Sequence, residues 1–248
     1  MVCLICLNIQ NKVSQIISII DFYNFVIDSL YHIFFLHDIL QQKTSRNYII
    51  RKTGGFTKMK IQNQLGYIKG ITFAPFHKRG SLSTQTARDS FDYMIEHTAA
   101  DFVILAPAGL QEHAHSEEIC YTSSATFSDE ELINMIRYAK SKSIRVALKP
   151  TVNCKNGVWR AYISFFEKDV PCEPKWENWF ASYTEFQTHY AKIAEAEQCD
   201  LFIAGCEMVM TEHRSEEWRN VIAAIRNYYH GPVSYNTDKY QEENVTWW

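Results

Sequence analysis

The chain has 248 residues, and its 25 lysine and arginine residues against 28 aspartate and glutamate residues give a formal charge of −3. Hydrophobic residues make up 46% and charged residues 21%, fractions that are typical of a globular protein and exclude a disordered one. The near-neutral charge argues against nucleic acid as a partner, because phosphate binding needs a basic face. Seven cysteines in a chain of this length fit reduced thiols and a cytoplasmic location better than a disulfide framework.

Residues 1–58 form a leader that differs in composition from the rest, since they contain no alanine, proline, glutamate or tryptophan. A signal peptide would need a basic first segment, and residues 1–7 contain no basic residue. An amphipathic anchor or extra helices are a second alternative, although residues 16–40, the nearest match to a membrane span, contain three aspartates and two histidines. The third is translated AT-rich DNA that is not native coding sequence, with Met59 as the start. No function is assigned to the leader, and a membrane partner is not expected.

From residue 67 onward, short apolar runs alternate with amphipathic segments. The runs predict strands at residues 69–75, 101–106, 144–149, 200–205 and 233–236. Helices are expected between them, the first capped by Ser83 or Thr84 and the second opened by a capping box of Ser128 and Glu131. Pro107 and Pro150 are expected to end the second and third strands. The faces expected to point inward comprise Ala87, Phe91, Met94 and Ile95; Leu132, Ile133, Ile136 and Ala139; Trp179, Phe180, Tyr183, Tyr190, Ile193 and Ala194; and Trp218, Val221, Ile222 and Ile225.

This alternation predicts an α/β fold with a parallel sheet covered by helices, either doubly wound or a (β/α)8 TIM barrel. No GxGxxG or Walker loop follows a strand, so nucleotide-binding forms lose support and no cofactor is expected. Long loops follow the carboxyl ends of strands, where a barrel has its active site. We therefore expect residues 67–248 to be a partial barrel domain with about strands one to five, ending before the sixth.

Glu207 is the strongest catalytic candidate, because it directly follows the fourth strand. A carboxyl group there points into the top of a barrel, and apolar neighbours suit a general acid. The alternative is a structural carboxylate paired with Arg160 or Lys149.

The loops after the third and fifth strands supply candidate substrate-binding residues. Trp159 could stack on a sugar or a base, and Arg160 could hold a carboxylate; a packed tryptophan lid with a surface arginine is the alternative. Tyr235 and Asn236 end the fifth strand and could hydrogen-bond a polyol, although turn chemistry also explains Asn236.

His113 and His115 form an HxH pair that could bind zinc in a metal-dependent barrel hydrolase. The pair lies several residues beyond the second strand, so a solvated loop is favoured and no metal is predicted. Cys206 is expected to be a small core residue rather than a nucleophile.

Eight strings, taken in order, resemble glycoside hydrolase family 113. They are FAPF at 73–76, ILAP at 104–107, LKPTVNC at 148–154, GVWR at 157–160, WFASY at 179–183, GCEM at 205–208, EWR at 217–219 and SYN at 234–236. The family belongs to a clan of (β/α)8 retaining glycosidases and includes β-mannanases. The resemblance implies a carbohydrate substrate, Glu207 as the acid/base, and Lys149, Trp159, Arg160 and Tyr235 lining or supporting the sugar subsites.

The sequence also departs from the family pattern. Cys206 stands where many clan members have asparagine, and Asp238 and Lys239 stand where β-mannanases tend to have an Asn-Trp pair. The resemblance places the nucleophile on a seventh strand, and a retaining mechanism needs two carboxyl groups. We therefore expect a truncated, inactive and unstable chain whose intact parent hydrolyses a mannan- or xylan-type β-linked sugar. An inactive fragment or carbohydrate-binding remnant is the alternative.

Overall fold

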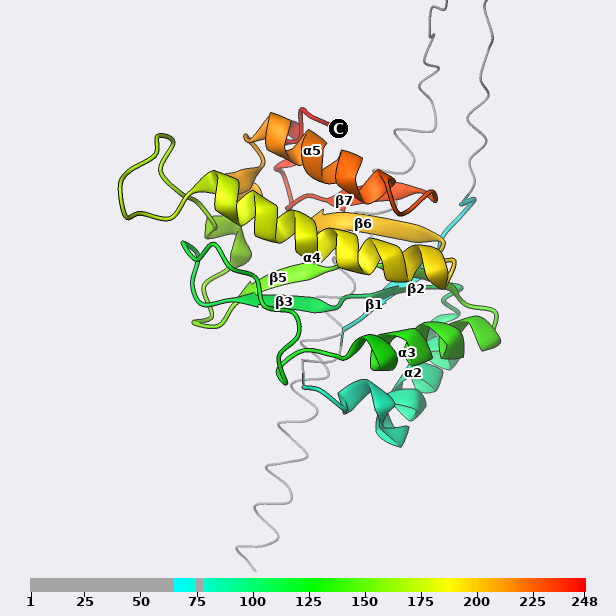
Figure 1. The fold of residues 1–248 in the computed structure, drawn as a ribbon. Coiled ribbons are helices and arrows are strands. Elements are labelled where there is room, and N and C mark those ends of the chain that lie inside the picture. Colours follow the sequence, from blue (N-terminus) through cyan, green and yellow to red (C-terminus); the bar gives the residue numbers. More distant parts are fainter. Residues whose placement is uncertain (1–64, 75–77) are drawn as a thin grey trace, which may run out of the picture. The chain divides into compact units, whose positions relative to one another are not determined.

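The computed structural model describes residues 65–74 and 78–248, which lie in the unit Gln62–Trp248. The alternatives raised for residues 1–58 fall outside the described residues. Five parallel strands form one sheet in the order β1-β2-β4-β6-β7 (Figure 1). Their bounds are Gly70–Phe73, Phe102–Leu105, Arg145–Leu148, Leu201–Cys206 and Val233–Asn236.

Helices connect neighbouring strands of this sheet. They are α2 (Gln85–Thr98), α3 (Asp129–Ser141), α4 (Trp176–Ala196) and α5 (Ser215–Arg226). Each added strand pairs with the one before it, whereas a doubly wound sheet reverses its strand order at a switch point. The winding is therefore that of a (β/α)8 barrel, and the carboxyl ends of the strands meet at one edge. No helix of residues 65–74 and 78–248 is long and apolar enough to span a membrane.

β2 and β4 end just before Pro107 and Pro150, as predicted, but the sequence pattern did not predict the new strand that starts after each proline. β3 (Ala108–Gln111) and β5 (Thr151–Cys154) form a second parallel pair. The register is the same on both sides, so the two prolines stand opposite each other. Proline has no N–H to donate, which interrupts the ladder without turning the chain. The backbone N–H of Thr151 still donates to the Pro107 carbonyl at 2.9 Å.

The core between the helices and the sheet is rich in aromatic side chains. Trp179, Tyr183 and Tyr190 of α4 are each 1% exposed or less, and the Tyr183 hydroxyl donates to the Ala204 carbonyl of β6 at 2.8 Å. Figure 1 shows α4 beside α5. The rings of Tyr183 and Trp218, one from each helix, pack together with their centroids 5.3 Å apart. The predicted inward faces are buried, except that Ile95, Ile133, Ile193 and Ile222 are partly exposed.

Helix α3 begins with the predicted capping box. The backbone N–H of Glu131 donates to the Ser128 hydroxyl at 3.2 Å, and the backbone N–H of Ser128 donates to Glu131 Oε2 at 2.9 Å. Glu131 Oε1 also accepts the backbone N–H of Leu82 at 3.2 Å, which ties α3 to the short helix η1 (Ser81–Ser83). Burial alone would raise the pKa of Glu131, but hydrogen bonds to its carboxylate from the backbone of Gly80, Ser128 and Leu82 and from the Ser128 hydroxyl outweigh it and lower the pKa.

We predict that Glu131→Ala lowers the free energy of unfolding by about 2 kcal/mol at neutral pH, because it leaves buried N–H groups without an acceptor. Glu131→Gln should lose less, since its amide oxygen still accepts. The folded-state pKa is lowered, so the stabilisation is present above the unfolded-state pKa and is lost as the pH falls through the folded-state pKa. Urea unfolding at several pH values measures both effects, and equal losses for the two variants would contradict the capping role.

Candidate active site

Glu207 directly follows β6 and its backbone has φ 54°, in the left-handed region. This conformation costs a residue with a side chain about 1 kcal/mol and is found at functional sites. Its backbone N–H donates to the carbonyl of Asn236, the last residue of β7, at 2.8 Å. The side chain is 16% exposed. The predicted catalytic carboxyl group therefore lies at the carboxyl edge of the sheet on a strained backbone.

Gly205 permits the close packing below this turn. A Cβ atom there would lie 2.7 Å from Cε2 of Tyr235 and 2.9 Å from the hydroxyl oxygen of Tyr183. Both separations are too short for a carbon atom without a shift of buried aromatic rings. Glycine is therefore required two residues before Glu207 for a reason of space.

The Glu207 carboxylate contacts two of the predicted substrate-binding residues. Oε2 accepts from Nη1 of Arg160 at 2.7 Å and from the indole N–H of Trp159 at 3.2 Å. Arg160 is itself fixed, since Nε donates to the Val152 carbonyl at 2.8 Å and Nη2 to Oδ1 of Asn153 at 2.7 Å. The ion pair raised as the alternative for Glu207 is thus present, within a cluster built from β5, β6 and η2 (Arg160–Tyr162).

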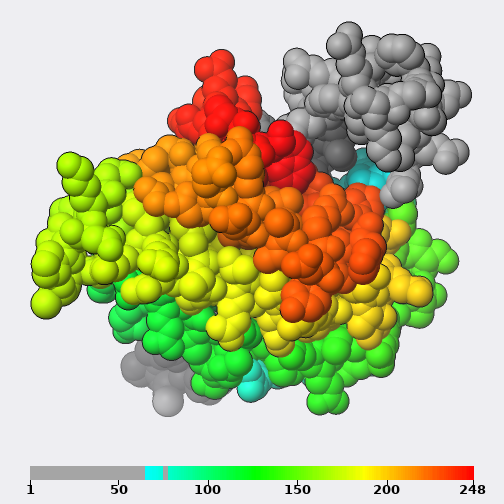
Figure 2. Space-filling model, turned by 45° about the horizontal axis from the view of Figure 1, so that its top comes forward, coloured from blue at the N-terminus to red at the C-terminus, as the bar shows by residue number. Residues whose placement is uncertain are grey.

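The segment that carries Trp159 and Arg160 runs from β5 to α4 and projects at one end of the unit, where it is yellow-green in Figure 2. It is attached to the turn before α5. Glu167 of this segment pairs with Nε2 of His213 at 3.0 Å and with Nη1 of Arg214 at 3.3 Å. These contacts bring the segment close to the residues that follow Glu207.

Lys149 and Asn236 lie together at the same edge of the sheet. Lys149 is 5% exposed, and its Nζ donates to Oδ1 of Asn236 at 3.3 Å. Asn236 thus meets Lys149 through its side chain and Glu207 through its backbone carbonyl. Tyr235 is different, because its ring is buried and its hydroxyl faces Glu212 and the backbone of Met208 rather than the open edge.

The HxH pair is placed in the loop after β3. Nδ1 of His115 lies 2.7 Å from the Ser164 carbonyl, and Nδ1 of His113 accepts the backbone N–H of His115 at 3.3 Å. Within residues 65–74 and 78–248, no group of three or more histidine, cysteine, aspartate or glutamate side chains could hold a metal ion. Cys206 is 3% exposed, with its Sγ 3.9 Å from Nη1 of Arg160.

Glu212 is a buried carboxyl group that the sequence reasoning missed. It is 0% exposed, follows the short helix η3 (Val209–Thr211), and accepts the Tyr235 hydroxyl at 2.7 Å. Burial raises the pKa of Glu212, and the hydrogen bond from Tyr235 offsets part of this rise. No strand end or motif marks position 212, so only its burial in the fold reveals it.

Glu212 should make the protein less stable as the pH rises. Its folded-state pKa is raised above the usual 4.5, so its contribution is fully present below pH 4.5 and is lost as the pH rises through the folded-state pKa. Glu212→Gln removes this titration while keeping an acceptor for Tyr235. We expect the unfolding free energy of the wild type, relative to the variant, to fall between pH 4 and pH 8 in urea titrations. A constant difference would contradict a raised pKa.

Comparisons with known proteins bear on the family and the fold. The model of Glycoside Hydrolase Family 113 matches residues 71–248. The solved structure of a GH113 beta-1,4-mannanase is 52% identical with a TM-score of 0.72, covering 73% of this chain and 59% of that one. The GH113 beta-mannanase AaManA from Alicyclobacillus acidocaldarius in complex with ManMIm is 40% identical with a TM-score of 0.70, covering 74% and 58%.

This chain therefore spans about three fifths of the length of the mannanases that it matches. No curated protein matches it. The matched structures confirm the predicted barrel-type fold and the predicted family. With most of its length covered by the family model, the chain belongs to glycoside hydrolase family 113.

Proposed function

We propose that the protein is a retaining glycosidase acting on β-linked mannan, with Glu207 as its general acid/base. The observation that carries the proposal is the Glu207 carboxylate at the end of the fourth barrel strand, in contact with Trp159 and Arg160. Two of the similar structures are named as β-mannanases, which supports mannan over xylan as the substrate.

In the proposed reaction, Glu207 protonates the glycosidic oxygen while a second carboxylate attacks the anomeric carbon. The glycosyl-enzyme ester that forms is then hydrolysed by a water from which Glu207 takes a proton. The family resemblance assigns the second carboxylate to the seventh strand of a complete barrel. The described sheet has five strands, of which β7 is the fifth. Residues 71–248 would thus supply the acid/base side of the site.

Arg160 and Trp159 have distinct proposed roles. The guanidinium of Arg160 stabilises the ionised Glu207 that serves as base in the second step, and proton donation in the first step requires this ion pair to open. Trp159 is 42% exposed, so its ring can stack on a sugar while its N–H holds the carboxylate. Lys149 and Asn236 would support a sugar subsite next to Glu207. Tyr235, which is buried, would support that subsite without contacting the sugar.

A carbohydrate-binding protein without hydrolysis is the second candidate. The exposed Trp159 ring, with Tyr162 packed edge-on at 5.9 Å, favours sugar binding whether or not bonds are cleaved. Assaying the 248-residue chain on β-1,4-mannan separates the two. Release of reducing ends supports the glycosidase, whereas mannotriose binding without release supports the binding protein.

We predict that Glu207→Gln lowers kcat/KM for β-1,4-mannan about 10³-fold, because a poor leaving group needs a proton. An aryl β-mannoside with an acidic phenol should lose far less in its first step. The measurement compares both substrates in a form that cleaves mannan: the 248-residue chain, or Gln62–Trp248 joined to the remaining strands of the 52% identical mannanase.

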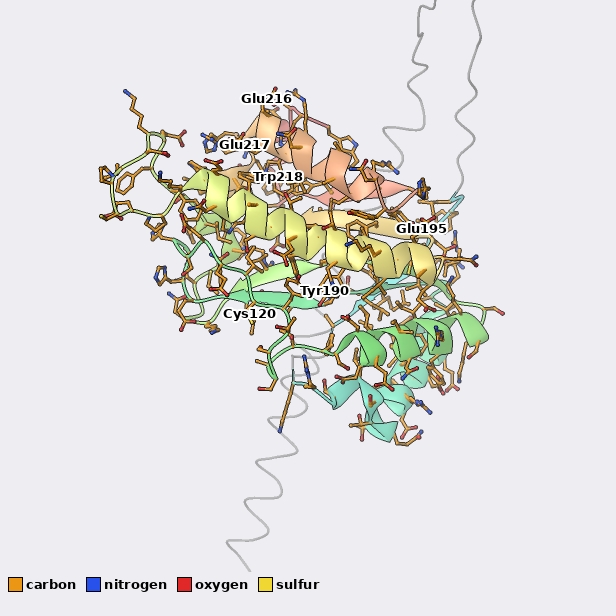
Figure 3. All side chains as sticks on the ribbon, viewed as in Figure 1. Cys120, Tyr190, Glu195, Glu216, Glu217 and Trp218 are labelled. Atoms are coloured by element: carbon orange, nitrogen blue, oxygen red, sulfur yellow. The ribbon has the colours of Figure 1, made fainter. Side chains whose placement is uncertain are left out.

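Glu216→Gln is the matched control for this experiment, since Glu216 is 82% exposed on α5 and pairs with Arg219. Figure 3 shows Glu216 at the outer surface of the helix. The control should leave both rates unchanged. Equal losses on both substrates for Glu207→Gln would rule out the acid role. With Glu207→Ala, azide should restore turnover of the aryl substrate, because this anion attacks the glycosyl-enzyme without a base.

A further inference from the structure

A buried carboxyl–phenol pair, Glu212 and Tyr235, contacts the backbone that follows Glu207. Glu212 is 0% exposed and Tyr235 is 6% exposed, and the Tyr235 hydroxyl donates to Glu212 Oε1 at 2.7 Å. The same hydroxyl oxygen accepts the backbone N–H of Met208 at 3.2 Å. The Tyr235 hydroxyl thus links a buried carboxyl group to the peptide that follows Glu207. The proposed reaction uses neither group directly.

The two peptide planes that flank Glu207 are both held by β7. The N–H of Glu207 belongs to the plane before its Cα and donates to the Asn236 carbonyl at 2.8 Å. The N–H of Met208 belongs to the plane after it and donates to the Tyr235 hydroxyl. Because φ and ψ are the rotations between these planes, fixing both planes fixes the backbone of Glu207. Consecutive residues of β7 therefore hold it at φ 54°.

The strand pairing next to Glu207 is irregular, which explains why its backbone needs these two hydrogen bonds to β7. Ile203 pairs with Ser234 and Cys206 pairs with Asn236, so three steps along β6 match two steps along β7. This irregularity inserts one extra residue into β6 between Ile203 and Cys206, close to Glu207. Bulges of this kind re-aim side chains and leave part of the ladder unpaired. Met208 lies beyond the last residue of β6, so its N–H is outside the ladder, and the Tyr235 hydroxyl supplies its acceptor.

Glu212 is a fixed point because its own backbone is anchored. The chain folds back after Met208, whose carbonyl accepts the N–H of Thr211 at 2.8 Å, and the carbonyl of Glu212 accepts the indole N–H of Trp247 at 2.9 Å. The indole N–H of Trp218, labelled at the start of α5 in Figure 3, donates to the Thr211 carbonyl at 3.0 Å. The carboxyl group of Glu212 is therefore held where it can orient the Tyr235 hydroxyl.

We propose that Glu212 is a positioning residue which, through the Tyr235 hydroxyl and the Met208 N–H, aims the Glu207 carboxylate at the reacting glycosidic oxygen. The inference rests on Glu207 being the acid/base of the proposed function. Glu212 touches no substrate in this scheme. Its hydrogen bond to Tyr235 makes the phenol oxygen a better acceptor for Met208, since chained hydrogen bonds polarise one another.

The indole N–H of Trp159 reports the position of the Glu207 carboxylate independently of catalysis, because it donates to Glu207 Oε2. We would record its ¹⁵N–¹H NMR signal, assigned with Trp159→Phe, in the 248-residue chain. Tyr235→Phe and Glu212→Met should shift this signal, whereas Glu212→Gln, which keeps an acceptor for Tyr235, should leave it at the wild-type position. Tyr229→Phe is the matched control, because it removes another buried hydroxyl, bonded to the Cys199 carbonyl at 2.7 Å near the other end of β6.

The double variant Tyr235→Phe/Glu212→Met separates positioning from stability. Replacing both partners by apolar groups leaves neither the carboxyl group nor the phenol buried alone, so the double variant should lose less of its unfolding midpoint than the two single variants together, the remaining loss coming from the Met208 N–H. We expect it to keep the shifted Trp159 signal. In a mannan-cleaving form it should lower kcat about 10²-fold with little change in KM, as expected for a misplaced group.

A wild-type Trp159 signal in the double variant, or an equal shift in Tyr229→Phe, would overturn the inference and leave the role of Glu207 untouched. A shifted signal in a protein that cleaves no mannoside in any form would instead count against the proposed function alone. The two failures are therefore distinguishable.

Discussion

The backbone of Glu207 is held in a left-handed conformation by hydrogen bonds to β7, and the arrangement around its carboxylate depends on that hold. The conformation is unfavourable for a residue with a side chain, so the surrounding contacts must supply more than its cost. They do so through two successive N–H groups and through packing against Gly205, where buried aromatic rings leave no room for a Cβ atom. The site therefore depends on the backbone geometry of Glu207 and on the Tyr235 side chain that helps to hold it.

The paired prolines separate β2 from β3 and β4 from β5. Because Pro107 and Pro150 stand opposite each other, the interruption affects both strands equally and the register survives it. β5 follows Pro150 and provides Asn153 and the Val152 carbonyl, which both bind Arg160. Arg160 in turn binds Glu207. Without β5, Arg160 would lack the Val152 carbonyl and the Asn153 side chain that fix its guanidinium group.

The sequence was informative wherever the signal is local. Apolar runs located the strands, the Ser128 and Glu131 spacing located the start of α3, and the position of Glu207 after an apolar run located the candidate carboxyl group. The continuation past Pro107 could not be predicted, because it depends on pairing with a strand 43 residues away. The pair of Glu212 and Tyr235 likewise spans 23 residues and has no periodicity or motif.

The anchoring of Arg160 constrains how the ion pair with Glu207 can open. Nε and Nη2 of Arg160 are both engaged by β5, at 2.8 Å and 2.7 Å, so the guanidinium plane cannot turn away without breaking two further hydrogen bonds. The backbone of Glu207 is clamped by β7 and cannot follow. Opening the ion pair therefore requires rotation about the side-chain bonds of Glu207. In the proposed reaction, the change from proton donor to base is therefore a movement of this one carboxyl group between a fixed cation and the sugar.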